Sequence, residues 1–284
     1  MINTKDVFMA CEASYEEATI VIFGVDFDGT CSFRPGTRFG PGALRRASYG
    51  VETFSWSTQK DLEDYKIFDR GDLGCPMGDN VSTQAMIKET TKTILNDGKF
   101  PLMIGGEHSI SYPSIEAAYE KHSDLMVIQL DAHADLRESY MNNPLSHASV
   151  MYRTVNLLGP RRVIQWGIRS GTKEEYAFAK ENTILLPASV QALKVVASSL
   201  GTTPIYLTID VDVIDPSLLP GTGTPEPGGI TYSMYEEVLE VLSSLNIVGA
   251  DMVELSPDYD HHGVSSVVVA KMVRQLLMLI GEKQ

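Results

Sequence analysis

Short apolar runs alternate with longer amphipathic stretches along most of the chain. The runs are rich in β-branched residues, and each is followed by a turn with Gly, Asp or Pro and then by apolar residues at helical spacing. This is the pattern of repeated strand and helix units. We expect strands at residues 20–25, 66–69, 100–104, 125–130, 163–167, 183–186, 205–209 and 247–253. We expect helices at residues 83–95, 112–121, 148–158, 190–200, 232–245 and 264–280.

This alternation predicts an α/β fold with a parallel sheet. Several of the strands are apolar almost throughout, as expected when helices cover both faces. The pattern alone allows either an open sheet between helical layers or a closed eight-stranded barrel. Both architectures place the functional site at the carboxyl ends of the strands. The Pro- and Gly-rich stretch 220–229 follows a strand, so we expect it to line that site.

Length and composition are those of a globular enzyme. The chain has 284 residues, 43% of them hydrophobic, and contains no linker-like stretch, so we expect one domain over residues 1–284. No apolar run approaches the roughly 18 residues of a membrane span, and residues 1–10 lack the pattern of a secretory signal. We therefore predict a cytoplasmic protein with no membrane partner. Cys11, Cys31 and Cys75 follow no C-x-x-C spacing, which argues against disulfides and thiolate zinc sites.

The charge balance narrows the choice of partners. The 37 acidic residues outnumber the 23 basic ones, which gives a net charge of −14. Such a field repels the phosphate backbone of a nucleic acid, so we expect no nucleic-acid partner. The same field attracts small cations.

Acidic and imidazole side chains gather where three predicted strands end. Asp131-Ala132-His133-Ala134-Asp135 follows one strand, Asp210-Val211-Asp212 follows a second, and Gly105-Gly106-Glu107-His108 follows a third. In extended backbone, residues two apart point the same way, so each segment presents its ligand atoms to one side. The paired glycines allow a sharp turn that presents His108.

Four aspartates brought together need positive charge. Two carboxylates about 4 Å apart repel by about 4 kcal/mol at an effective dielectric near 20. Two divalent cations would neutralise Asp131, Asp135, Asp210 and Asp212, with His108 and His133 as neutral ligands. Oxygen and nitrogen donors without sulfur favour Mn²⁺ or a similar first-row ion.

Each segment alone also has a purely structural interpretation. An aspartate at a strand end is often a cap or turn former, and we expect this of Asp215, which precedes Pro216. A lone histidine such as His108 is more often simply hydrogen-bonded than a ligand. We interpret His122, His261 and His262 as surface residues, and Asp26 and Asp28 as residues that shape a loop over the cleft. Only the three segments together make the metal site the stronger interpretation.

These segments resemble the motifs of the ureohydrolase family, which includes arginases and agmatinases. The resemblance covers nearly the whole chain. It rests on 105–109 (GGEHS), 131–135 (DAHAD), 210–212 (DVD) and 252–255 (MVEL), in this order. Two further stretches, 27–41 and 221–229, look most like the agmatinase branch.

The resemblance implies a three-layer α/β/α fold with a central, mainly parallel eight-stranded sheet and two Mn²⁺ ions per subunit. In such a site His108 and Asp135 bind one ion, His133 and Asp212 bind the other, and Asp131 and Asp210 bridge them. Two ions about 3.5 to 4 Å apart can share a water and lower its pKa from about 15.7 towards about 7. The hydroxide would attack the guanidinium carbon, and agmatine would yield urea and putrescine, as in polyamine biosynthesis.

The resemblance also implies roles for residues around the ions. Glu254 would bind the guanidinium, and His147 would transfer a proton to the departing amine. Both therefore count as catalytic residues, together with Asp135. Thr224 would contact the guanidinium or Glu254. A bidentate carboxylate fixes the orientation of a planar cation as well as its charge. The family resemblance further suggests a homo-oligomer, either a trimer or a hexamer.

Other functions stay open from the sequence. Guanidinobutyrate, other guanidino acids and arginine carry a carboxylate tail, which Arg137, Asn142 or Asn143 could bind. A deacetylase has a similar fold but uses one zinc ion, and the retained His108 and Asp212 argue against it. A non-enzymatic scaffold would need a lost ligand or a lost Glu254, and none is missing.

Overall fold

One continuous parallel sheet organises the molecule. The computed structural model describes residues 7–284, so part of the expectation for residues 1–10 lies outside the described residues. The sheet has eight strands in the order β4-β1-β5-β10-β9-β6-β7-β8, and all its neighbouring pairs are parallel. The strands are β1 (Ile20–Gly24), β4 (Ile67–Asp72), β5 (Phe100–Ile104), β6 (Met126–Leu130), β7 (Val163–Trp166), β8 (Ile184–Leu186), β9 (Pro204–Asp210) and β10 (Asn246–Val253).

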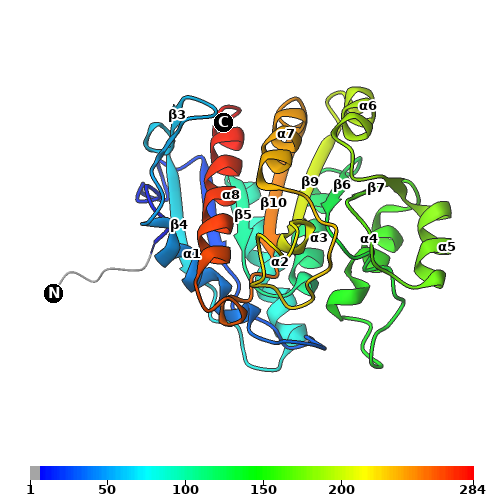
Figure 1. Cartoon of the computed structure of the whole chain (residues 1–284). Helices are drawn as coiled ribbons and strands as arrows, with labels where there is room; N and C mark the ends of the chain where they lie inside the picture. The colour runs from blue at the N-terminus through cyan, green and yellow to red at the C-terminus, as the bar shows by residue number, and fades with distance from the viewer. Residues whose placement is uncertain (1–6) are drawn as a thin grey trace.

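Helices cover both faces of this sheet (Figure 1). On one face lie α1 (Gly40–Ser48), α8 (Val264–Gly281), α7 (Tyr232–Leu242) and α6 (Val190–Leu200). On the other lie α2 (Asn80–Asn96), α3 (Ser111–Lys121) and α4 (Val150–Leu158), while α5 (Lys173–Asn182) lies beside β8 at the sheet edge. Strand residues alternate between the two helical layers: Ile128 and Leu130 face one, whereas Val127 faces the other. Apolar side chains on both strand faces therefore pack into a core beneath each helical layer.

The expected three-layer α/β/α fold is confirmed, and the barrel alternative is wrong because β4 and β8 are open edges. Every predicted strand and helix exists, with ends that differ by a few residues. Two helices were missed. Helix α1 begins Gly-Pro-Gly, which is typical of a turn, but a proline in the first helical turn costs little because its missing N–H would have no partner there. Helix α5 buries only Glu175 and Ala179, so it lacks an apolar stripe.

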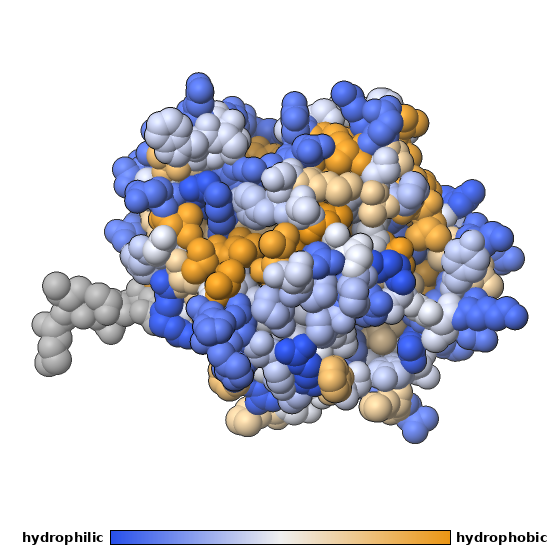
Figure 2. Space-filling view, viewed as in Figure 1, coloured by the Kyte–Doolittle hydropathy of each residue, from blue (hydrophilic) through white to orange (hydrophobic). Residues whose placement is uncertain are grey.

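The side of the molecule that carries α8 has a small hairpin and an exposed apolar surface. A two-stranded antiparallel hairpin, β2 (Phe54–Ser55) with β3 (Lys60–Asp61), was not predicted from the sequence. Helix α8 is long and apolar enough by composition to cross a membrane, but 67% of it is buried inside the protein, which explains its hydropathy. Figure 2 shows an apolar strip crossing this face where the lower half of α8 lies. Val264 and Val267, at the start of α8, are exposed.

Candidate metal centre

Four neighbouring central strands end at the same place and carry the candidate ligands. Strand β5 leads to His108, β6 to Asp131, β9 ends at Asp210, and β10 leads to Glu254. These strands are neighbours in the order β5-β10-β9-β6, although they are far apart in the sequence. The chain crosses from β5 to β6 and later returns to fill the gap with β9 and β10. A crevice at such a point is the usual ligand site of an open α/β sheet.

His108 lies at the centre of one group of ligand atoms. Its Nδ1 is 3.1 Å from Asp131 Oδ2, 3.1 Å from Asp135 Oδ2 and 3.4 Å from Asp210 Oδ2. All four side chains are buried. The atoms of His108, Asp131 and Asp135 lie close enough together to hold a metal ion.

His133 lies at the centre of a second group that shares Asp131 with the first. His133 Nδ1 is 2.9 Å from Asp212 Oδ2 and 3.8 Å from Asp131 Oδ1. The ligand atoms of Asp131, His133 and Asp212 lie within 4.8 Å of one another, close enough to bind one metal ion. The two oxygens of Asp131 thus point to different histidines, which is the arrangement of a bridging carboxylate. The structure therefore brings together all six predicted ligands, in two adjoining groups.

The group needs positive charge to be stable. In the chain alone, burial raises the pKa of Asp131 to about 7, and the neighbouring Asp212 and Asp135 add to the rise. Burial lowers the pKa of His133, but Asp212 and Asp131 outweigh it and raise the pKa to about 11. Burial, then Asp212 and Asp131, also hold the pKa of Asp210 well above its usual range. Buried carboxylates this close to one another share protons or bind cations.

The hydrogen bonds behind His108 leave the correct nitrogen free for a metal. Thr208 Oγ1 donates to Asp251 Oδ1 at 2.6 Å, so its only proton is used. His108 Nε2 lies 2.9 Å from the same Oγ1 and must be the donor in that contact. In the neutral ring Nδ1 then carries the lone pair, and this buried atom points at the oxygens of Asp131, Asp135 and Asp210. Metal-binding histidines commonly have such a partner behind them, so the residues present fit a metal ion.

Unusual backbone conformations bring the site residues into position. Gly105 and Gly106 have φ of 81° and 77°, as expected from the paired glycines. A Cβ on Gly106 would lie 2.8 Å from the carbonyl oxygen of Val25, so no side chain fits there. Asp135 and Glu254 also adopt left-handed conformations, with φ of 52° and 70°. Such strain at non-glycine residues is typical of functional sites.

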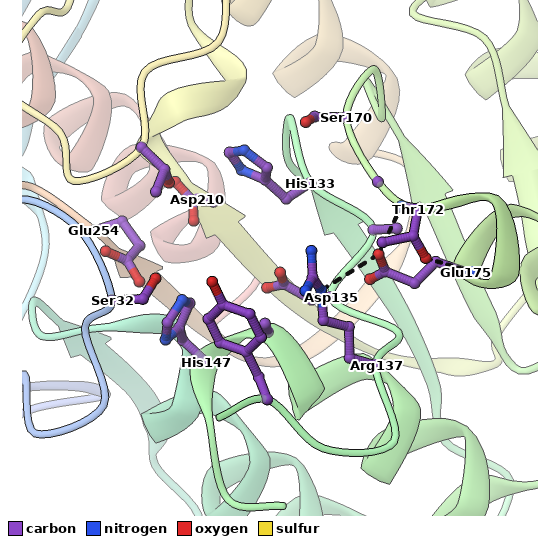
Figure 3. A pocket seen from close by; sticks show the side chains of 15 residues that line it. Ser32, His133, Asp135, Arg137, His147, Ser170, Thr172, Glu175, Asp210 and Glu254 are labelled. Carbon is purple, nitrogen blue, oxygen red and sulfur yellow. Dashed lines mark hydrogen bonds and ion pairs between the residues drawn. The ribbon is translucent and has the colours of Figure 1, made fainter. Parts of the chain in front are cut away.

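A cavity of about 290 Å³ opens onto both groups. Figure 3 shows Glu254, Ser32 and His147 on one side and Thr172, Glu175 and Arg137 on the other. Thr224 also lines it. Glu254 Oε1 accepts a 2.7 Å hydrogen bond from the backbone N–H of His108. Burial, with a smaller effect of Glu107, raises the pKa of Glu254 to about 8. The cavity is large enough for a small guanidino compound and offers it a buried acid.

Comparison with known proteins agrees with this geometry. A model of the arginase family matches residues 18–279. The chain belongs to the arginase family. The agmatinase of Bacillus anthracis is 44% identical over 96% of this chain and 95% of its own length. The agmatinase of Bacillus subtilis is 43% identical over 96% of this chain and 95% of its own. The agmatine ureohydrolase of Thermoplasma volcanium has a TM-score of 0.87 at 31% identity, covering 98% of this chain and 95% of that one. The family resemblance expected from the motifs is therefore confirmed.

In this arginase-family chain, some of the residues predicted to bind substrate line the cavity and others do not. Arg137 lines the cavity, with Nε 3.6 Å from Glu175 Oε2 and its guanidinium over the ring of Tyr140. Asn142 and Asn143 do not line it. Thr224 Oγ1 lies 3.5 Å from Asp212 Oδ2, and Thr224 lines the same cavity as Glu254.

The residues expected outside the site do lie outside it. Asp28 shapes its loop by accepting from Gly36 N and pairing with Arg38. Asp215 accepts from Ser217 N, as a turn former does. His261 and His262 are exposed, and His122 is half-buried.

Several residues around this arginase-family site were missed by the sequence analysis. Thr208 contacts the candidate ligand His108 and is itself hydrogen-bonded to Asp251. Thr30 contacts His147 and is itself hydrogen-bonded to Glu107. A readable signal existed for Asp251, because a charged residue inside an apolar strand needs a partner. The hydroxyl of Thr30 gave no such signal, since its partners come from segments distant in sequence.

Proposed function

We propose that this chain is an agmatinase, which hydrolyses agmatine to urea and putrescine with two Mn²⁺ ions per subunit. The observation that carries the proposal is the meeting of both ligand groups and Glu254 around one small cavity, in a chain 44% identical to an agmatinase. His108 and Asp135 would hold one ion, His133 and Asp212 the other, and Asp131 and Asp210 both. When bound, two such ions supply Lewis-acid chemistry that makes water nucleophilic at neutral pH.

The chain's own residues perform the remaining tasks. Glu254 pairs with the guanidinium and orients its carbon, because a carboxylate and a planar cation match in shape as well as charge. His147 lines the same cavity and delivers a proton to the departing amine, which cannot leave as an anion. Asp135 would hold one of the ions and lines the cavity, so it would contribute to both metal binding and catalysis. The hydroxyl of Thr224 donates to Asp212 Oδ2 and helps to hold that carboxylate in place.

The substrate tail distinguishes agmatine from its alternatives. Agmatine ends in an ammonium group, whereas arginine and guanidinobutyrate carry a carboxylate. Arg137 lines the cavity, which favours a guanidino acid as the second candidate. Glu175 and the ring of Tyr140 already engage the Arg137 guanidinium, and this leaves it less able to bind a carboxylate. A relative from Thermococcus kodakarensis, 38% identical, is an N(1)-aminopropylagmatine ureohydrolase, so a longer cationic tail belongs in the test.

One assay separates these substrates. Protein stripped of metal is reloaded with Mn²⁺ and given agmatine, arginine, guanidinobutyrate or aminopropylagmatine, and urea is measured. We expect the fastest release from agmatine. Release from arginine alone, or from a guanidino acid alone, would overturn the assignment. Glu254→Gln should lose turnover while keeping its metal, and Glu138→Gln, at an exposed acid of the nearby loop, serves as its control.

Three broader features belong to the same proposal. We infer one domain over residues 1–284, a cytoplasmic location, and a homo-oligomer of three or six subunits. The apolar strip with exposed Val264 and Val267 on α8 supports an oligomer, since contiguous apolar surface commonly marks an interface. Analytical ultracentrifugation would measure the subunit number directly.

A further inference from the structure

A buried acid outside the ligand set lies behind His147. Glu107 is fully buried and follows strand β5. It accepts hydrogen bonds from the backbone N–H of Thr30 at 2.7 Å and from the hydroxyl of Thr30 at 2.5 Å. The hydroxyl of Ser109 also donates to it at 2.5 Å. Glu107 therefore accepts from all three of these donors.

Thr30 connects this acid to His147. A hydroxyl has one proton, and Thr30 donates it to Glu107. The remaining contacts of Thr30 Oγ1 are therefore accepted ones. They come from the backbone N–H of His147 at 3.0 Å and from His147 Nδ1 at 3.2 Å. It follows that His147 Nδ1 carries a hydrogen in the neutral ring.

The other contacts of His147 are compatible with this assignment. Ser146 Oγ lies 3.4 Å from Nδ1, farther than Thr30 Oγ1, and accepts from the backbone N–H of Ala148. Its second lone pair can accept from an Nδ1–H group as well. The ring of Tyr140 meets His147 edge-on, with centroids 5.9 Å apart and an angle of 84° between the rings. The imidazole is therefore held by a hydrogen bond at Nδ1 and by a ring contact.

We propose that Thr30 and Glu107 are positioning residues that fix His147 as the Nδ1–H tautomer and leave Nε2 to handle the proton of the reaction. This inference rests on the proposed function for the identity of the reaction. Nε2 takes a proton from water and passes it to the departing nitrogen, which keeps the electron pair of the breaking carbon–nitrogen bond. The ring then returns to the neutral Nδ1–H form. The bonds from His147 to Thr30 and from Thr30 to Glu107 do not change direction at any stage.

The same arrangement occurs a second time in this structure. At His108, a threonine hydroxyl lies between the imidazole and a buried carboxylate, Thr208 with Asp251. There the threonine meets Nε2 and leaves Nδ1 free, whereas at His147 it meets Nδ1 and leaves Nε2 free. In each case the threonine fixes which nitrogen carries the hydrogen and which one is left with the lone pair. A threonine can do this only because its proton is already committed to a carboxylate.

Removal of one hydroxyl tests the proposal. Thr30→Val keeps the shape of the side chain but cannot accept from His147, and Thr30→Ser restores the hydroxyl. We expect Thr30→Val to keep its metal content and its KM for agmatine while kcat falls about tenfold to a hundredfold, since positioned proton transfer contributes about 10²- to 10⁴-fold. Thr30→Ser should recover most of the lost kcat. Thr91→Val removes a buried hydroxyl on α2 that is hydrogen-bonded to Ser114 on α3. It is the matched control and should leave kcat unchanged.

A spectroscopic measurement separates this inference from the proposed function. In the metal-free full chain with ¹⁵N-labelled histidine, the resonances missing from His147→Asn belong to His147. We expect neutral His147 to be the Nδ1–H tautomer in the wild type and a mixture of tautomers in Thr30→Val. An Nε2–H tautomer in the wild type, or an unchanged tautomer and kcat in Thr30→Val, would overturn the proposal. Failure of the wild type to release urea from agmatine would instead refute the function and leave the tautomer result standing.

Discussion

The hydroxyl of Thr208 donates a 2.6 Å hydrogen bond to the buried carboxylate of Asp251 and thereby decides which nitrogen of His108 can bind a metal. Tyr206 donates to the other oxygen of Asp251 at 2.9 Å. Burial raises the pKa of Asp251, and these two hydrogen bonds oppose the rise. The metal centre therefore depends on residues in the strands beneath it as well as on its ligands.

Thr208→Val should weaken metal binding without altering any ligand. The valine cannot accept from His108 Nε2, so the ring loses the contact that fixes its tautomer. Loss of such a partner typically costs about 10- to 100-fold in metal affinity. Competition with a chelator measures the change, and Thr91→Val is again the control. An unchanged Mn²⁺ affinity would show that His108 does not depend on this contact.

Asp210→Ala and His147→Ala should separate metal binding from proton transfer. Asp210 lies 3.4 Å from His108 Nδ1 and lines the cavity, so its removal should lower both metal content and urea release. His147 is hydrogen-bonded to Thr30 and not to any candidate ligand, so its removal should spare the metal and lower kcat. Elemental analysis of both variants beside the wild type checks this. Equal metal loss in the two variants would contradict the assigned roles.

Metal binding should stabilise the fold. The ion-free chain holds Asp131, Asp135, Asp210 and Asp212 in one buried group, and cations would relieve their repulsion. A ligand at 100 times its Kd adds about 2.7 kcal/mol per site to the free energy of unfolding. Addition of Mn²⁺ after exhaustive chelation should therefore raise the Tm by several degrees and restore urea release. Activity that persists in the chelated protein would count against a metal-dependent reaction.

Arg45→Met should destabilise the protein far from the metal centre. Arg45 is buried and contacts Asp69 through Nε at 2.8 Å and through a second nitrogen at 2.9 Å. Its loss leaves Asp69 buried without a counter-charge, which typically costs about 3 to 5 kcal/mol. Lys92→Met breaks an exposed pair with Glu120 and should cost about 1 kcal/mol or less. Thermal unfolding of the two variants compares them, and equal shifts in Tm would refute the expectation.

Much of the fold could be predicted from the chain because its elements are strongly periodic. The strand before Asp131 is apolar except for Gln129 and is bounded by turns, so both its presence and its end were readable. Helix α5 was missed although Thr172 and Glu175 form a capping box, whose spacing is a readable start signal. The many polar residues of α5 hid that signal, because a helix at the sheet edge needs little apolar surface. The β2–β3 hairpin is too short to produce any pattern.

The amino-acid sequence by itself determined the alternation of elements, the acids and histidines at the strand ends, and the family. These properties are local, because side-chain chemistry and spacing along one segment do not depend on distant residues. Only the tertiary structure decided that the sheet is open and that β9 and β10 lie between β5 and β6. It also decided that Thr30 and Glu107 meet behind His147, and that Thr208 and Asp251 meet behind His108. The contacts made by the two threonines join residues as far as 117 positions apart. Which of them form depends on how the whole sheet packs between its helices.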